Sequence, residues 1–221
     1  MKREILITAD GSTTIRIPEL NENYHSSHGA IQEAKHVFIA NGLDLFKNQT
    51  EISILEIGFG TGLNAFITFL ETQNKEKVNY VGVEAYPIAQ AEVNQMNYPS
   101  ELKAISFTSI FQKLHSCDWE QEVTIGSHFK FTKRQQLFQD IEDKNLYNLI
   151  YFDAFGFTLQ PELWSELIFK KMFEALQPNG VLVTYACRTS IKNAMITAGF
   201  AIEKLPGAPG KREMLRATKI V

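Results

Sequence analysis

The stretch Ile52-Ser-Ile-Leu-Glu-Ile-Gly-Phe-Gly-Thr-Gly-Leu-Asn64 decides the fold of this 221-residue chain. An apolar run leads into Gly58, Gly60 and Gly62, and a helical pattern follows. This order is typical of a buried strand that turns tightly into a helix, because glycine allows unusual backbone dihedrals and the close approach of a ligand. The free N–H groups at the start of the helix then face the ligand and favour negative charge.

Two classes of ligand use such a turn. A dinucleotide fingerprint needs a small residue three positions after the second glycine, so that helix and strand can pack closely, but Leu63 stands there. The pattern Glu-x-Gly-x-Gly-x-Gly, with Glu56 as its acid, resembles motif I of the class I S-adenosylmethionine methyltransferases. That resemblance implies that Glu56 faces the charged amino-acid part of the ligand, directly or through water. We therefore favour S-adenosylmethionine over NAD.

The composition is that of an ordinary soluble globular protein, with 44% hydrophobic and 21% charged residues. The net charge of −3 argues against a broadly basic RNA-binding surface, so any RNA contact must gather its basic residues on one face. No apolar run approaches the ~20 residues of a membrane span, and the first residues lack the features of a signal peptide. We predict a cytoplasmic protein without membrane contact.

Residues that could bind a metal ion are few. Cys117 and Cys187 provide neither a disulfide framework nor a metal cluster. His25, His28 and His36 lie near one another in the chain, but no acidic residue has suitable spacing to join them. We predict turn and capping roles for these histidines, and no bound metal.

The first fifty residues look like an accessory piece. Residues 4–8 and 13–17 alternate in polarity around Asp10-Gly11, which is a strong signal for a β-hairpin. Helical spacing follows within residues 24–42.

Two further buried strands end in carboxylates. Glu84 closes the strand 78–84 at about 20 residues beyond the glycines, where an acid can accept hydrogen bonds from ribose hydroxyls. The strand 149–153 delivers Asp153 to the crevice at the carboxyl ends of the strands, where open α/β sheets place their chemistry.

The order of the later elements is strand, helix, strand, helix and finally an antiparallel pair. It predicts an α/β, Rossmann-like fold of the class I methyltransferase type, with a mostly parallel seven-stranded sheet and an antiparallel C-terminal strand. Pro178-Asn-Gly180 is expected to turn into the fifth strand, 181–186. We assign residues 51–221 to this domain and residues 1–50 to a small N-terminal extension of hairpin and helix.

Four stretches carry a wider resemblance. They are Tyr24-His-Ser with Gly29-Ala-x-x-Glu33 and His36-Val-Phe-Ile; Glu56-Ile-Gly-Phe-Gly-Thr-Gly-Leu-Asn64; Asp153-Ala-Phe with Pro161-Glu-Leu-Trp164; and Ala198-Gly-Phe200 through Gly210-Lys-Arg-Glu-Met-Leu215. Together they resemble the methyltransferase domain of the MnmC family of tRNA wobble-uridine modification enzymes, whose stand-alone relatives are also called MnmD. The glycine motif alone indicates only the superfamily, and the third and fourth stretches narrow it to this family.

The resemblance implies methylation of the aminomethyl group on carbon 5 of uridine at the wobble position, 34, of tRNA. The methyl donor would be S-adenosyl-L-methionine and the partner the tRNA anticodon loop, with no flavin-dependent oxidase partner in this chain. The residues expected at the cofactor are Tyr24, Glu56, Gly58, Phe59, Gly60, Thr61, Gly62, Asn64, Glu84 and Asp153.

Asp153 is the candidate for the chemistry. An alkylamine is mostly protonated at neutral pH, whereas methyl transfer needs its free lone pair. A nearby carboxylate can take or relay the proton and aim the lone pair, and such help typically contributes about 10²–10⁴-fold in rate. The alternative is that Asp153 only caps the next helix or holds water.

Aromatic and basic residues are the candidates for substrate binding. A wobble base must leave the anticodon-loop stack to enter a pocket, which favours aromatic platforms. We predict that Phe155, Phe157 and Trp164 bind the base, with membership of the core as the alternative for each. Lys211 and Arg212 are the predicted phosphate contacts. Further candidates are Tyr24 for the base and Arg188, Lys192 and Lys204 for phosphates, with a solvated charge cluster as the alternative for these three.

Two departures from the family pattern affect the predicted site. Family members often carry Gly-Asp at the end of the third strand, where the carboxylate meets the adenine amino group, but Thr132-Lys133 stands there. Lysine cannot accept that hydrogen bond, so a backbone group or another side chain must recognise adenine. Gly156-Phe157 replaces the small residue and proline of the common forms, which could alter the base pocket but keeps the carboxylate.

Two other functions stay open. A methyltransferase for a small-molecule amine or acid would suit the acidic net charge and would lack a basic stripe beside Asp153. A non-catalytic chain would bind S-adenosylmethionine and act as an interaction module.

Overall fold

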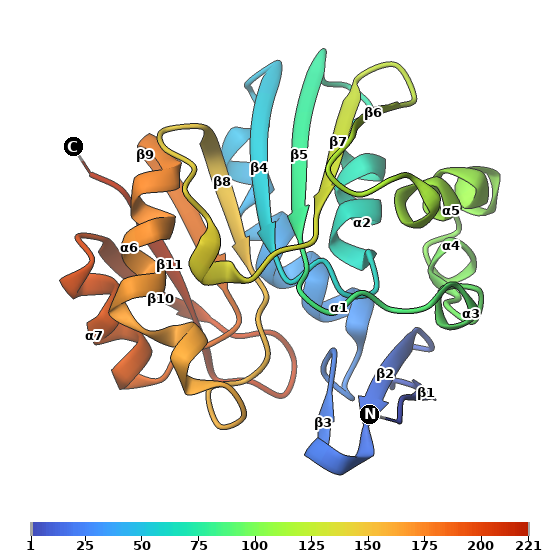
Figure 1. The fold of residues 1–221 in the computed structure, drawn as a ribbon, viewed down its shortest axis with the longest axis horizontal. Coiled ribbons are helices and arrows are strands. Elements are labelled where there is room, and N and C mark those ends of the chain that lie inside the picture. Colours follow the sequence, from blue (N-terminus) through green and yellow to red (C-terminus); the bar gives the residue numbers. More distant parts are fainter. Residues whose placement is uncertain (1, 221) are drawn as a thin grey trace.

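A computed structural model describes residues 2–220, which form two β-sheets (Figure 1). The smaller sheet is antiparallel and contains β1 (Glu4–Ile7), β2 (Thr13–Ile17) and β3 (Glu22–Asn23). The predicted hairpin is confirmed, with Asp10-Gly11 in its turn. The Asp10 carboxylate accepts the backbone N–H of Ser12 at 3.0 Å and that of Gln32 at 2.9 Å, so it ties the turn to the first helix.

The larger sheet has eight strands in the order β10-β11-β9-β8-β4-β5-β7-β6. Their bounds are β4 (Glu51–Ile57), β5 (Lys77–Val83), β6 (Glu122–Ile125), β7 (Phe129–Arg134), β8 (Tyr147–Phe152), β9 (Leu176–Thr184), β10 (Ala201–Pro206) and β11 (Glu213–Thr218). The five strands β9, β8, β4, β5 and β7 are parallel, and β11 lies antiparallel between β9 and β10. The predicted mostly parallel α/β fold is confirmed. One strand is added because β6 pairs antiparallel with β7 at the edge.

Helices cover both faces of the larger sheet, which gives three layers. The helices and turns are η1 (Pro18–Leu20), α1 (Ala30–Ala34), η2 (Lys35–Ala40), η3 (Leu43–Phe46), α2 (Leu63–Glu71), α3 (Gln90–Val93), α4 (Tyr98–Glu101), η4 (Ile105–Phe107), α5 (Thr108–Ser116), η5 (Phe138–Asp140), η6 (Pro161–Trp164), α6 (Glu166–Ala175) and α7 (Thr189–Thr197). Ile54 of β4 packs in one core with Phe66 of α2, whereas Leu55 packs in a second core with Phe169 of α6. Successive side chains of a strand point to opposite faces, so β4 holds the two helical layers together.

The N-terminal extension shares the first of these cores. Ile15 of β2 and Phe38 of η2 are buried in the same cluster as Phe66. The division at residue 50 remains a prediction. None of the helices in residues 2–220 combines the length and the apolar character that crossing a bilayer requires.

The expected turn at Pro178-Asn-Gly180 is wrong as a strand boundary, because β9 runs through it. Asn179 adopts a left-handed backbone with φ 61°, and the register against β8 shifts between Tyr147 and Leu149. The Asn179 N–H bonds the Lys219 carbonyl at 2.9 Å. Pairing with the end of the chain therefore keeps the strand continuous through an irregularity that looks like a turn in the sequence.

Candidate active site

A cavity of about 480 Å³ opens at the carboxyl ends of β4, β5 and β8. The loop that follows β4 forms one wall, and the segment that follows β8 forms the other. Tyr24 and His25, which follow β3, also line it. The cavity therefore lies where open α/β sheets bind their ligands.

The loop after β4 has a shape that only glycine supports. Gly58 has a φ of +90°, and a Cβ on it would lie 2.5 Å from the Asp153 carbonyl oxygen. Gly62 has a φ of +71°, and its Cβ would lie 2.6 Å from Nε2 of His115. Helix α2 begins directly afterwards, and its first amides have no partner within the helix. The loop can therefore hold a ligand through its backbone at a helix N-terminus.

The Glu84 carboxylate is fixed against this loop. One of its oxygens accepts the backbone N–H of Gly60 at 3.0 Å, and the other accepts that of Tyr86 at 2.9 Å. Glu84 lines the cavity at the end of β5. Its position is the one from which an acid can meet ribose hydroxyls.

Asp153 lines the cavity directly after β8. Its Oδ2 accepts a hydrogen bond from Nδ2 of Asn64 at 2.9 Å. Burial raises the pKa of Asp153 to about 7, and the Glu33 carboxylate adds to the rise, whereas the Asn64 hydrogen bond and the Lys211 ammonium oppose it. Asp153 can therefore change its protonation state near neutral pH.

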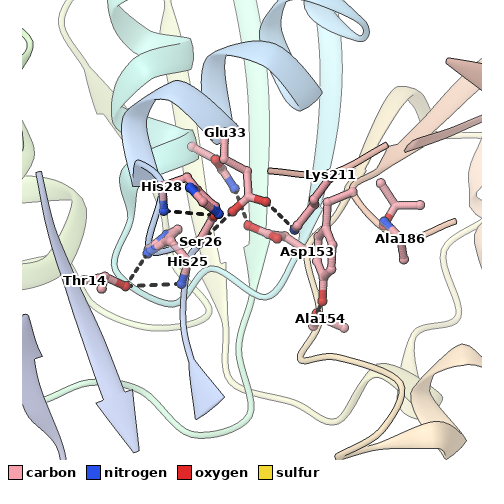
Figure 2. A network of polar contacts seen from close by, with 12 residues as sticks. Thr14, His25, Ser26, His28, Glu33, Asp153, Ala154, Ala186 and Lys211 are labelled. Atoms are coloured by element: carbon pink, nitrogen blue, oxygen red, sulfur yellow. Dashed lines mark hydrogen bonds and ion pairs between the residues drawn. The ribbon is translucent and has the colours of Figure 1, made fainter. Parts of the chain in front are cut away.

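A polar cluster lies beside Asp153 (Figure 2). Lys211 forms an ion pair with Glu33, and the second Glu33 oxygen accepts the backbone N–H of Ser26 at 2.9 Å. The Lys211 ammonium also lies 3.9 Å from the centre of the Tyr185 ring. The Tyr185 hydroxyl donates to the Ala154 carbonyl at 2.8 Å. These contacts fix the backbone next to Asp153.

Tyr24 and His25 bridge the small sheet and the cavity. The Tyr24 ring packs edge-on against Phe155, with 5.0 Å between the ring centres. His25 lies between Oγ1 of Thr14, 3.0 Å from Nδ1, and Oγ1 of Thr61, 3.5 Å from Nε2. Burial lowers the pKa of His25 to about 4, so this ring is neutral at physiological pH.

The charges that line the cavity are mostly negative. The carboxylates are Glu22, Glu84, Asp153 and Glu162, and the one cation among the lining residues is Arg3. Arg3 is engaged by Glu92 at 3.1 Å. The cavity therefore suits a cationic ligand better than an anionic one.

Glu56 does not line the cavity. It is completely buried beneath the glycine loop, and its Oε2 accepts a hydrogen bond from the Tyr80 hydroxyl at 2.8 Å. Glu56 therefore does not meet a ligand in the cavity directly, because its side chain is buried, and a contact through water stays a prediction. Gly62 lies behind the loop as well, next to His115, and shapes the turn without lining the cavity.

The three residues predicted as aromatic platforms lie in three different environments. Phe155 lines the cavity. Trp164 is 1% exposed and donates from Nε1 to the Phe155 carbonyl at 2.8 Å, so it belongs to the core and is not a base platform. Phe157 lies outside the cavity under the Arg188 guanidinium, 5.1 Å from the ring centre. The proline-free segment after Asp153 therefore presents one aromatic ring to the ligand.

The two residues predicted to contact phosphates also differ in their exposure and pairing. Arg212 is exposed, as a phosphate contact requires. Lys211 is turned inward, and its charge is already paired with Glu33. Its position beside Asp153 indicates an electrostatic role within the site.

Lys133 is 1% exposed at the end of β7. Its ammonium lies 4.5 Å from the centre of the Trp119 ring and donates to the His115 carbonyl. It lines a separate hollow of about 60 Å³ behind the glycine loop. The main cavity is instead bordered near β7 by Leu137, Phe138 and Gln139, which are the residues available for an adenine ring on that side.

The histidines of the extension have separate partners. His36 contacts the Pro206 carbonyl through Nε2 at 2.8 Å, while His28 is exposed next to Gly210. Across residues 2–220 no three histidine, cysteine, aspartate or glutamate side chains gather as potential metal ligands.

Sequence reasoning missed three residues of the site. Glu33 and His25 stand in the first family stretch, so that stretch was a usable signal for both. Tyr185 was expected inside the fifth strand, 181–186, but it follows β9 directly, at the same edge of the sheet as Asp153. Its place near the carboxyl end of that strand was the available signal.

The sequence matches a family profile and curated proteins. A family profile described as S-adenosyl-L-methionine-dependent methyltransferase matches residues 90–220. The chain is 27% identical over 223 residues to the tRNA 5-methylaminomethyl-2-thiouridine biosynthesis bifunctional protein MnmC of Leptospira interrogans, covering 95% of this chain and 34% of that protein. It is 30% identical over 224 residues to the protein of the same name from Burkholderia mallei, covering 91% of this chain and 33% of the relative. The chain thus spans about a third of the length of these curated relatives.

A solved structure has the same fold. The crystal structure of MNMC2 from Aquifex aeolicus aligns with a TM-score of 0.79 at 24% identity, covering 99% of this chain and 70% of that one.

Proposed function

We propose that this chain, which belongs to the S-adenosyl-L-methionine-dependent methyltransferases, methylates the aminomethyl group on carbon 5 of the wobble uridine in tRNA. The name of the curated relatives, which refers to 5-methylaminomethyl-2-thiouridine biosynthesis in tRNA, supports this substrate. The observation that carries the proposal is the carboxylate of Asp153, held at the end of β8 in the cavity that the glycine loop also lines.

The cavity fits S-adenosyl-L-methionine. The residues that would hold it are Tyr24, Gly58, Phe59, Gly60, Thr61 and Glu84, with Leu137 and Phe138 on the adenine side. A Cβ at Gly60 would lie 3.2 Å from the Tyr24 ring, so the loop leaves little room for a side chain at this position. When bound, the cofactor supplies a methyl group on a cationic sulfur, and the negative lining suits that charge.

The residues around Asp153 suit an alkylamine acceptor. With its pKa raised to about 7, Asp153 can accept a proton from an alkylammonium group and still be ionised in part of the population. Asn64 orients the carboxylate, and Phe155 with Tyr24 offers an aromatic surface to the base. Because four carboxylates line the cavity, an acidic acceptor is disfavoured relative to an amine.

Basic side chains that are free of ion pairs support docking of RNA. Arg188 and Arg212 are exposed and Lys192 is half-buried, and none of the three forms an ion pair within the described residues. Arg188 lies against Phe157, which belongs to the segment after Asp153. Lys204 is paired with Glu213 at 2.8 Å and contributes less free charge. The anticodon-loop partner and a cytoplasmic location, where that partner is found, are parts of the same proposal.

The test is methyl transfer from labelled S-adenosyl-L-methionine to tRNA taken from cells that lack this modification, followed by nucleoside analysis. The expected product is 5-methylaminomethyluridine or its 2-thio form, at the wobble position alone. Transfer to small amines with no transfer to tRNA would replace the proposal with a small-molecule methyltransferase. Cofactor binding without transfer to either would indicate a binding module.

A further inference from the structure

Two buried oxygen atoms in this protein lack a hydrogen-bond partner. They are Oε1 of Glu56 and Oδ1 of Asn64, and no other buried side-chain nitrogen or oxygen of residues 2–220 shares this property. Glu56 is 0% exposed and Asn64 is 3% exposed. Leaving a buried polar atom without a partner costs free energy, so the pair requires an explanation.

The other polar atoms of both side chains are engaged. Tyr80 donates its hydroxyl hydrogen to Oε2 of Glu56 at 2.8 Å. Asn64 donates from Nδ2 to Oδ2 of Asp153 at 2.9 Å. Asn64 is also a neighbour of Glu56, close enough to lower the pKa of its carboxyl group. Because each unpartnered oxygen is an acceptor, one proton between them would satisfy both.

The surroundings of Glu56 favour a neutral carboxyl group. Burial raises the pKa of Glu56 well above its usual value, and the charges of Asp153 and Glu84 act in the same direction, while the Tyr80 hydroxyl and the neighbouring Asn64 amide oppose the rise. The titratable groups around it are Tyr80 on β5, Tyr151 and Asp153 on or after β8, and Glu84 after β5. None of these is a cation, and across residues 2–220 no lysine or arginine forms an ion pair with Glu56.

We propose that Glu56 is a protonated carboxylic acid that donates a hydrogen bond to Oδ1 of Asn64. Tyr80, Glu56 and Asn64 then form a buried chain that fixes the Asn64 amide with its N–H toward Asp153. Glu56 is thus a positioning residue that acts through Asn64 and does not touch the cofactor. This inference rests on the proposed role of Asp153 as the group that receives the proton.

The direction of the hydrogen bonds from Tyr80 through Glu56 to Asn64 affects the protonation state of Asp153. An N–H from Asn64 stabilises the ionised form of Asp153, which keeps it able to accept a proton. If the Asn64 amide were reversed, its oxygen would accept a hydrogen bond from a protonated Asp153 and would stabilise the neutral form. The two arrangements predict opposite changes in the pKa of Asp153 when Asn64 is removed.

Two variants at position 56 separate a positioning role from a cofactor contact. Glu56→Gln keeps a donor for Asn64 and an acceptor for Tyr80, so we expect turnover and cofactor affinity within about threefold of the natural chain. Glu56→Leu keeps the size but cannot donate, so turnover should fall by roughly 10- to 100-fold, the range for leaving a buried polar group without a partner, with cofactor affinity retained. A large loss of cofactor affinity in Glu56→Gln would contradict the proposal.

The closing experiment uses infrared spectra of the cofactor-free and substrate-free full chain across a pH titration, so it does not depend on methyl transfer. The natural chain should show a protonated carboxyl band at and above neutral pH that Glu56→Gln lacks. A second band, absent in Asp153→Asn, should disappear near pH 7 as Asp153 ionises. Asn64→Ala should move this second transition to higher pH.

Two results would overturn the inference. The first is a Glu56→Gln spectrum identical to that of the natural chain at neutral pH, which means that Glu56 is ionised. The second is a transition of Asp153 that moves to lower pH in Asn64→Ala. If instead tRNA methylation fails while the spectra behave as expected, the proposed substrate is wrong and the hydrogen-bonded chain stands.

Discussion

The two walls of the cavity are built in different ways. The glycine wall, Gly58–Asn64 with Glu84, comes from one loop and the end of the neighbouring strand, and it is shaped by backbone conformation. The Asp153 wall includes Asp153 and Tyr185, and it is supported by Glu33 and Lys211, which do not line the cavity. These residues lie far apart in the sequence and meet through side chains. A wall of backbone is sensitive to added bulk, whereas a wall of charged side chains is sensitive to lost charge. Changes to the first should therefore affect cofactor affinity, and changes to the second should affect turnover and its pH dependence.

The largest effect should come from the Asp153 wall. Asp153→Ala and the isosteric Asp153→Asn should each lower the rate of methyl transfer by at least about 10²-fold, because neither can accept the amine proton. Cofactor affinity measured by calorimetry should stay within about threefold, since the Gly58–Asn64 loop is unchanged. Near-normal turnover in Asp153→Asn would remove the difference between the walls.

The next largest effect should come from the glycine wall. Gly58→Ala places a Cβ 2.5 Å from the Asp153 carbonyl oxygen at a φ of +90°, so cofactor affinity should fall at least about tenfold and stability by about 1–3 kcal/mol. Calorimetry and thermal unfolding measure these changes. Gly156→Ala is the matched control, because its Cβ would meet only Oε1 of Glu22 at 3.5 Å and its backbone is not left-handed. Equal losses in both variants would show that the effect is not specific to the loop.

A smaller effect tests charge within the Asp153 wall. The Lys211 ammonium lowers the pKa of Asp153, so Lys211→Met should raise that pKa and move the acidic limb of the kcat/KM profile to higher pH. Removing the Glu33 charge as well, in the double variant with Glu33→Gln, should bring the limb back toward its original position, because Glu33 raises the same pKa. A limb that stays in place in Lys211→Met would mean that the cluster is only structural.

The smallest effect concerns basic residues that lie outside both walls. Arg212→Ala should weaken tRNA binding and reduce the slope of log affinity against log salt by about 1, because one phosphate contact is lost. Lys204→Ala is the matched control, since its charge is already paired with Glu213. Equal slopes in Arg212→Ala and the natural chain would place RNA docking on another face.

The same contrast explains how much the sequence could predict. The strand from Ile52 and the loop to Asn64 are local, so their glycines and alternating apolar residues indicate both conformation and position. Glu84 and Asp153 were predictable because each ends a buried parallel strand, and such ends meet at one edge of the sheet. The fold class follows from the same strand order.

The remaining site depends on contacts that spacing does not reveal. Glu33 and Lys211 are separated by most of the chain, so their ion pair requires helix α1 of the extension to lie beside the loop before β11. Trp164 and Phe155 are similar aromatic residues near one strand end, and only the packing distinguishes a core side chain from a cavity side chain. Glu56 is the acidic residue of the glycine motif, but its side chain is buried and accepts a hydrogen bond from Tyr80.

A crystal structure of the chain with S-adenosylhomocysteine and an anticodon stem-loop that carries 5-aminomethyluridine tests the central claim most directly. We predict the homocysteine part against the Gly58–Thr61 loop and the substrate amine within hydrogen-bonding distance of the Asp153 carboxylate, about 2.6–3.2 Å. An amine directed away from Asp153, or a modified base outside the cavity, would contradict the account.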